Sequence, residues 1–89
     1  MSVESLECRV NNPKGIHCRV ATRIAEIVSS HDSQVQIAGS EKSADCTSIL
    51  DILSLALTRN SRVVFTADGR DAAVVLDALQ SLLAKTEDP

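Results

Sequence analysis

A histidine and an arginine two residues apart are the most chemically suggestive pair in this sequence. His17 and Arg19 follow Gly15 in the segment Gly-Ile-His-Cys-Arg-Val-Ala. A glycine turn that leads into an amphipathic helix would place His17 beside the unpaired N–H groups of the helix N-terminus. A neutral imidazole is a nucleophile near pH 7, and a guanidinium and backbone N–H groups bind phosphate. The pair would therefore suit phosphoryl transfer to His17, but on its own the motif is explained more simply by a helix-capping or surface histidine.

The elements that would position this histidine alternate along the chain. Alternating apolar residues, β-branched runs and amphipathic stretches predict the order β-α-β-β-α-β-α. The expected strands cover residues 6–10, 34–37, 43–46 and 62–67, and the expected helices cover residues 18–29, 48–58 and 72–85. Asp71 is expected to cap the last helix, and residues 86–89 are expected to be a frayed tail. These elements predict an α+β fold, with a four-stranded antiparallel sheet and its helices on one face, in a single domain of residues 1–89.

Size, charge and hydropathy exclude several classes of protein. The chain has 89 residues, is 44% apolar and carries a net charge of −3. A nucleic-acid-binding protein needs a basic surface and often aromatic platforms, but Phe65 is the only aromatic residue. The apolar stretches are too short to span a bilayer, and no signal peptide is recognisable. We therefore expect a cytoplasmic protein without nucleic-acid binding or membrane insertion.

The three cysteines indicate neither a disulfide framework nor a metal site. Cys8, Cys18 and Cys46 are odd in number and form no Cys-x-x-Cys pair. Cys8 and Cys46 are expected to be small core residues. Cys18 would lie at a helix N-terminus, where thiolates are favoured, but it is more simply a neighbour of His17. No metal and no cofactor are predicted.

The second helix is more apolar than a surface helix of its length needs to be. Ile52, Leu55 and Ala56 would share a core-facing side. The remaining apolar residues, Ile49, Leu50 and Leu53, would then lie on a neighbouring face and remain at least partly exposed. Such a cluster on a soluble protein usually binds a partner. The alternative is a tilt of the helix that buries all of them.

Two segments resemble a known family. The segment around His17 is similar to the active-site segment, G-L-H-A-R-P-A, of the HPr phosphocarriers of the bacterial phosphotransferase system. Residues 48–55 resemble the family's S-I-M-G-V-M-S-L segment, and Ser48 follows His17 by 31 residues, as is usual in the family. The resemblance extends over nearly the whole chain and implies the HPr fold, an open-faced β-sandwich. This sequence departs from the family pattern at Cys18, at Val20, where proline is usual, and at Asp51, where glycine is common.

The resemblance also implies a function. His17 would accept phosphate through Nδ1 from phospho-Enzyme I, itself charged by phosphoenolpyruvate, and would pass it to an EIIA domain of a sugar permease. The protein would be a monomeric carrier rather than an enzyme, and the apolar cluster of the second helix would dock both partners. Ser48 matches the serine that an HPr serine kinase phosphorylates in some bacteria. A capping box formed by Ser48 and Asp51 would explain that pair equally well.

Two other functions are compatible with the residues. A regulatory HPr paralogue that signals nitrogen or carbon status would keep the same histidine. A ligand-binding module of ACT type would use the turn at Gly15 as a ligand loop and would usually dimerise, and His17 would then be incidental.

Overall fold

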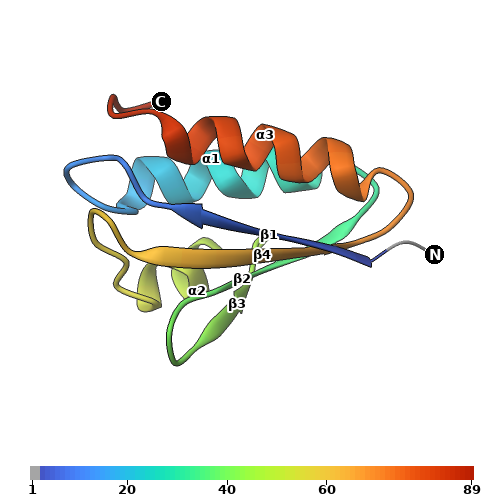
Figure 1. Cartoon of the computed structure of the whole chain (residues 1–89), viewed down its shortest axis with the longest axis horizontal. Helices are drawn as coiled ribbons and strands as arrows, with labels where there is room; N and C mark the ends of the chain where they lie inside the picture. Colours follow the sequence, from blue (N-terminus) through green and yellow to red (C-terminus); the bar gives the residue numbers. More distant parts are fainter. Residues whose placement is uncertain (1–2) are drawn as a thin grey trace.

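The computed structural model describes residues 3–89, and its elements follow the predicted order. They are β1 (Val3–Arg9), α1 (Cys18–Ser29), β2 (Gln34–Ala38), β3 (Ser43–Asp45), α2 (Ile49–Ser54), β4 (Arg62–Asp68) and α3 (Ala72–Ala84). Helices α1 and α3 lie side by side over one face of the sheet (Figure 1). Helix α2 packs against α1 and β3 at the edge of the sheet. No helix within residues 3–89 is long and apolar enough to cross a membrane.

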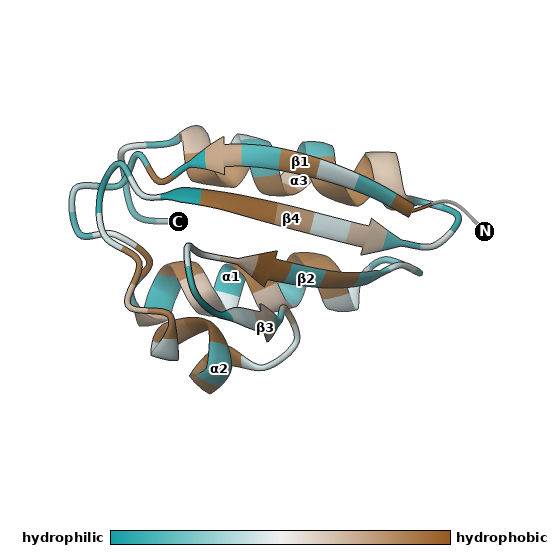
Figure 2. Ribbon diagram, turned by 60° about the horizontal axis from the view of Figure 1, so that its bottom comes forward, coloured by the Kyte–Doolittle hydropathy of each residue, from teal (hydrophilic) through white to brown (hydrophobic). Residues whose placement is uncertain are grey.

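The sheet is antiparallel throughout, as predicted. Its strand order is β1-β4-β2-β3, so β4 lies between β1 and β2. Figure 2 shows the strands in front of α1 and α3, which cover the far face. Within residues 3–89 no helix covers the near face, which is the open face expected of this fold.

The core forms between the sheet and the two long helices. Along β4 the side chains of Val63, Phe65 and Ala67 are fully buried, while Arg62 and Val64 point to the open face. This alternation follows from the two-residue period of a strand with one buried side. Apolar stripes of α1 and α3 cover the buried side and complete the core.

The cysteines lie as expected. Cys8 and Cys46 are buried, Cys18 is exposed, and all three are free thiols. Burial raises the pKa of the Cys46 thiol to about 12, and it also raises the pKa of Cys8. Both thiols are therefore protonated near pH 7 and behave as small apolar side chains.

Helix α2 is shorter than predicted and ends at Ser54. Leu55 is half-buried and packs against the core near Ile52, as predicted. Ala56 has a left-handed backbone (φ +52°) and is exposed, so the prediction that it shares the core-facing side is wrong. The chain leaves the helix here because it must return to the first loop, where the Ile16 N–H donates to the Leu57 carbonyl at 3.0 Å.

Asp71 precedes α3, as predicted, but its side chain does not cap the helix. Its carboxylate accepts hydrogen bonds from the Asp32 N–H and the Ser33 hydroxyl instead. These bonds lower the pKa of Asp71 and tie the loop after α1 to the start of α3. The prediction failed because a distant loop competes for the same carboxylate.

Candidate functional site

The loop between β1 and α1 holds His17 in place through its own hydrogen bonds. The Asn12 carbonyl accepts from the Gly15 N–H, and the Asn12 side-chain oxygen accepts from the Lys14 N–H, both at 2.9 Å. Gly15 has a left-handed backbone (φ +71°), and a Cβ there would collide with the Leu57 carbonyl. Only glycine fits both requirements, so the turn predicted at this position is fixed by backbone and packing together.

His17 is the N-cap of α1. Its Nδ1 accepts a hydrogen bond from the Arg19 N–H at 3.3 Å, the role that serine or aspartate usually plays. The first intrahelical bond runs from the Ala21 N–H to the His17 carbonyl at 2.9 Å. An Nδ1 that accepts carries a lone pair, so the proton of the neutral ring is on Nε2. The nucleophilic nitrogen therefore faces the N-terminus of the helix.

The second ring nitrogen contacts a residue that the sequence did not point to. Nε2 of His17 lies 2.9 Å from Oδ1 of Asp88, in the segment predicted to be frayed. The same carboxylate accepts from Asn12 Nδ2 at 2.9 Å and pairs with Lys14 at 3.5 Å and Arg19 at 3.9 Å. The hydrogen bonds from Asn12 and then His17 are the largest causes that lower the pKa of Asp88 to about 2. The prediction of a frayed tail is wrong at this residue.

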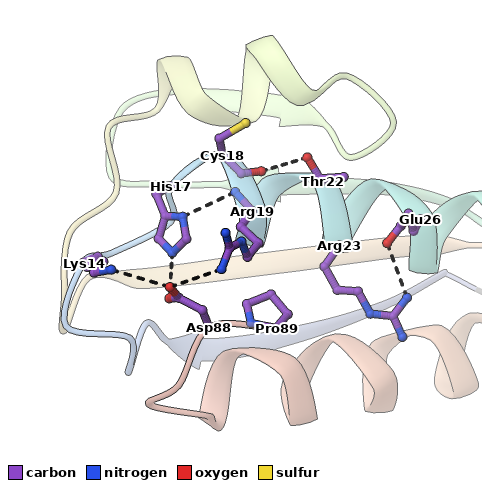
Figure 3. Close-up of a pocket in the computed structure, with 9 residues that line it drawn as sticks. All are labelled: Lys14, His17, Cys18, Arg19, Thr22, Arg23, Glu26, Asp88 and Pro89. Carbon is purple, nitrogen blue, oxygen red and sulfur yellow. Dashed lines mark hydrogen bonds and ion pairs between the residues drawn. The ribbon is translucent and has the colours of Figure 1, made fainter.

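These residues border a groove at the start of α1 (Figure 3). The groove has a volume of about 530 Å³. Its lining consists of Lys14, His17, Cys18, Arg19, Thr22, Arg23, Glu26, Asp88 and Pro89. The side chain of His17 is 28% exposed and that of Arg19 is 67% exposed, so a reactant can reach both. The lining carries three cations and two carboxylates, and the remaining positive charge together with the helix N-terminus makes the groove suitable for an anion.

Cys18 is the first residue of α1, and its thiol points away from the imidazole and towards α2 (Figure 3). Its carbonyl accepts from the Thr22 hydroxyl at 2.8 Å. The thiol therefore takes no part in the contacts around His17. In the part of the chain that the structure describes, no group of three or more His, Cys, Asp or Glu could hold a metal ion.

The apolar residues of α2 are exposed to different degrees. Leu50 is 79% exposed, whereas Ile49 and Leu53 are half-buried against the core. Tilting of the helix therefore does not bury the cluster, and Leu50 is its most prominent member. Helix α2 packs against α1, the helix that begins after His17.

Ser48 is the N-cap of α2, as predicted. Its hydroxyl accepts from the Asp51 N–H at 3.4 Å, and Ser48 is half-buried at the edge of the apolar cluster. The capping interpretation of this pair is therefore confirmed for the serine side chain.

Comparisons with known proteins agree on one family. The family model described as the PTS HPr component phosphorylation site matches residues 5–85. The phosphocarrier protein NPr of Shewanella violacea is 33% identical over 72 residues, which are 81% of this chain and 79% of that protein. The multiphosphoryl transfer protein of Xanthomonas campestris pv. campestris is 30% identical over 80 residues, which are 90% of this chain but only 10% of that much longer protein.

Solved structures show the same fold. The chain superposes on the phosphocarrier protein HPr of Bacillus anthracis with a TM-score of 0.87 at 24% identity, covering 93% of this chain and 99% of that one. It superposes on HPr-C-His of Thermoanaerobacter tengcongensis with a TM-score of 0.85 at 26% identity, covering 91% of both chains. The predicted fold is confirmed, and the interpretation as an ACT-type module is not supported.

Proposed function

Because the chain belongs to the HPr family of phosphocarriers of the phosphotransferase system, we propose that His17 is the residue that carries the phosphoryl group. Phospho-Enzyme I would be the donor and an EIIA domain the acceptor. The observation that carries this proposal is the hydrogen bond from the Arg19 N–H to His17 Nδ1 at 3.3 Å. It orients a lone pair toward the positive end of a helix, where a phosphoryl group is best stabilised.

The chemistry follows from this orientation. The Nδ1 lone pair attacks phosphorus, and the bond from phosphorus to the donor nitrogen breaks with its electron pair returning to the donor. The Nε2 proton stays in place, so the ring of the phosphorylated protein carries a positive charge. Backbone N–H groups of the first turn of α1 and the guanidinium of Arg19 bind the phosphoryl oxygens. The protein supplies one group that is consumed and regenerated, and it turns over no substrate alone.

Docking of both partners is assigned to the apolar cluster of α2. Leu50 is the exposed anchor, with Ile49 and Leu53 supporting it from half-buried positions. A phosphate on Ser48 would place about two negative charges at the edge of this cluster, beside the carboxylate of Asp51. We therefore assign a regulatory role to Ser48 where a serine kinase is present.

The test is phosphorylation by a purified Enzyme I and phosphoenolpyruvate, followed by intact mass. The wild type should gain one phosphate that is lost in acid and survives base, and His17→Ala should gain none. Full labelling of His17→Ala would refute the assignment. A regulatory paralogue would give the same labelling, and it would differ in which EIIA domain removes the phosphate.

A further inference from the structure

The tail after α3 returns to the loop that carries His17, and specific hydrogen bonds hold it there. The Asn11 N–H donates to the Leu83 carbonyl at 3.2 Å, and its side chain donates to the Ala84 carbonyl at 3.1 Å. These two bonds fix the end of α3 against the loop. The four residues that follow then bring Asp88 to the imidazole edge (Figure 3).

A buried amide sets the position of the Asp88 carboxylate. Asn12 is only 5% exposed, and both ends of its side chain are used: the oxygen accepts from the Lys14 N–H and the nitrogen donates to Asp88. Exposed ion pairs are loose and easily exchanged. A buried neutral donor is directional, so Asp88 Oδ1 is placed by Asn12 at 2.9 Å and meets His17 Nε2 at 2.9 Å.

We propose that Asp88 is a positioning residue for phosphoryl transfer at His17, a step that rests on the function proposed above. By accepting from Nε2–H it keeps the ring proton on Nε2 and the lone pair on Nδ1. When Nδ1 bonds to phosphorus, the ring becomes an imidazolium and the Asp88 carboxylate stabilises its charge. When the phosphoryl group leaves, the electron pair of the N–P bond returns to Nδ1 and the ring is neutral again. No proton moves in either direction.

The geometry separates this role from a blocking one. Nδ1 and Nε2 are on different edges of the ring, Nδ1 facing the Arg19 N–H and Nε2 facing Asp88. A phosphoryl group on Nδ1 and the carboxylate on Nε2 can therefore bind at once. A tail that blocked the site would have to occupy the Nδ1 edge.

The experiment compares Asp88→Asn and Asp88→Ala with Glu87→Gln. Glu87 is exposed, is next to Asp88 and has the same charge. Its substitution therefore controls for the change in net charge and for any general effect of a substitution in the tail. Two readouts are taken: the ring tautomer of His17 from ¹⁵N chemical shifts, and the rate of phosphorylation by phospho-Enzyme I and by phosphoramidate, a small donor that needs no docking.

Asp88→Ala should shift part of the His17 population away from the Nε2–H tautomer. Asp88→Asn keeps an amide oxygen that can accept from Nε2–H, so it should lose mainly the negative charge that stabilises the imidazolium. The rates of both variants should fall roughly tenfold with both donors, the equivalent of one charge-assisted hydrogen bond, while Glu87→Gln should match the wild type. A wild-type tautomer and wild-type rates in both Asp88 variants would overturn the proposal. Faster phosphorylation of the variants would also overturn it, because the tail would then be a blocking segment. A wild type that neither donor labels at His17 would instead refute the proposed function itself.

Discussion

Leu50 and Ile52 lie two residues apart on α2 and form a matched pair that separates docking from folding. Leu50 is 79% exposed, and Ile52 is 1% exposed. A substitution at an exposed site away from caps and special contacts changes the free energy of unfolding by about 0.5 kcal/mol or less. Leu50→Glu should therefore leave the thermal transition almost unchanged. If Leu50 is an interface anchor, its loss should cost about 2 kcal/mol or more of binding, which is roughly a 30-fold weaker Kd for Enzyme I.

Ile52→Glu should behave in the opposite way. It removes a buried side chain and puts a carboxylate in its place, and the two effects together cost several kcal/mol. The total stability of a small domain is only about 5–15 kcal/mol, so much or all of the folded population should be lost. The assay is circular dichroism on heating for both variants, with isothermal titration against Enzyme I for those that fold. Leu50→Glu with wild-type affinity would refute α2 as the docking surface. Ile52→Glu with a wild-type melting temperature would refute the assigned core.

Three further outcomes are expected. Arg19→Ala should slow phosphoryl transfer and leave the melting temperature nearly unchanged. The Arg19 side chain is 67% exposed, and its nearest anion, Asp88, lies 3.9 Å away, so it contributes little to stability. A large fall in melting temperature at an unchanged transfer rate would contradict this. Ala56→Gly should raise stability by up to about 1 kcal/mol, measured by urea unfolding, because Ala56 has φ +52° and a left-handed backbone penalises any Cβ. Contacts lower the pKa of Asp88 from 3.8 to about 2, so they should stabilise the tail fully at a pH above 3.8 and be lost as the pH falls toward 2. The side-chain amide resonances of Asn12 should report this release. Resonances that stay constant down to pH 2 would speak against it.

Local patterns predicted the fold because each element carries its own period. The β-branched run of residues 62–67 predicts β4, and the structure adds which side is buried, namely that of Val63, Phe65 and Ala67. The extent of α2 was less predictable. Its apolar run continues to Leu57, but the Leu57 carbonyl is needed by the Ile16 N–H, and this distant hydrogen bond ends the helix early.

The candidate site was also predictable from the sequence only in part. His17 and Arg19 could be found because a glycine turn and a helix start are encoded within a few residues. Asp88 is 71 residues from His17, and an aspartate in a polar tail carries no local signal for a contact. Asn12 is a turn residue whose side-chain oxygen accepts from the Lys14 N–H, but its second role as the donor to Asp88 depends on where α3 ends. Asp71 failed as a helix cap for the same reason, since the loop at Ser33 competes for its carboxylate.

The function proposed here gives His17 two roles that use the same lone pair. In the free protein Nδ1 accepts from the Arg19 N–H and caps α1. A bond from Nδ1 to phosphorus would consume this acceptor and leave the first turn without its cap. The phosphoryl group brings three oxygens to the same place, and each is a stronger acceptor than a neutral imidazole. A phosphoryl oxygen would then replace Nδ1 as the acceptor of the Arg19 N–H, so α1 would begin at the same residue with and without the phosphoryl group. On the proposed function, the N-terminus of α1 would therefore bind the phosphoryl group without refolding, as a carrier that is phosphorylated and dephosphorylated in every cycle requires.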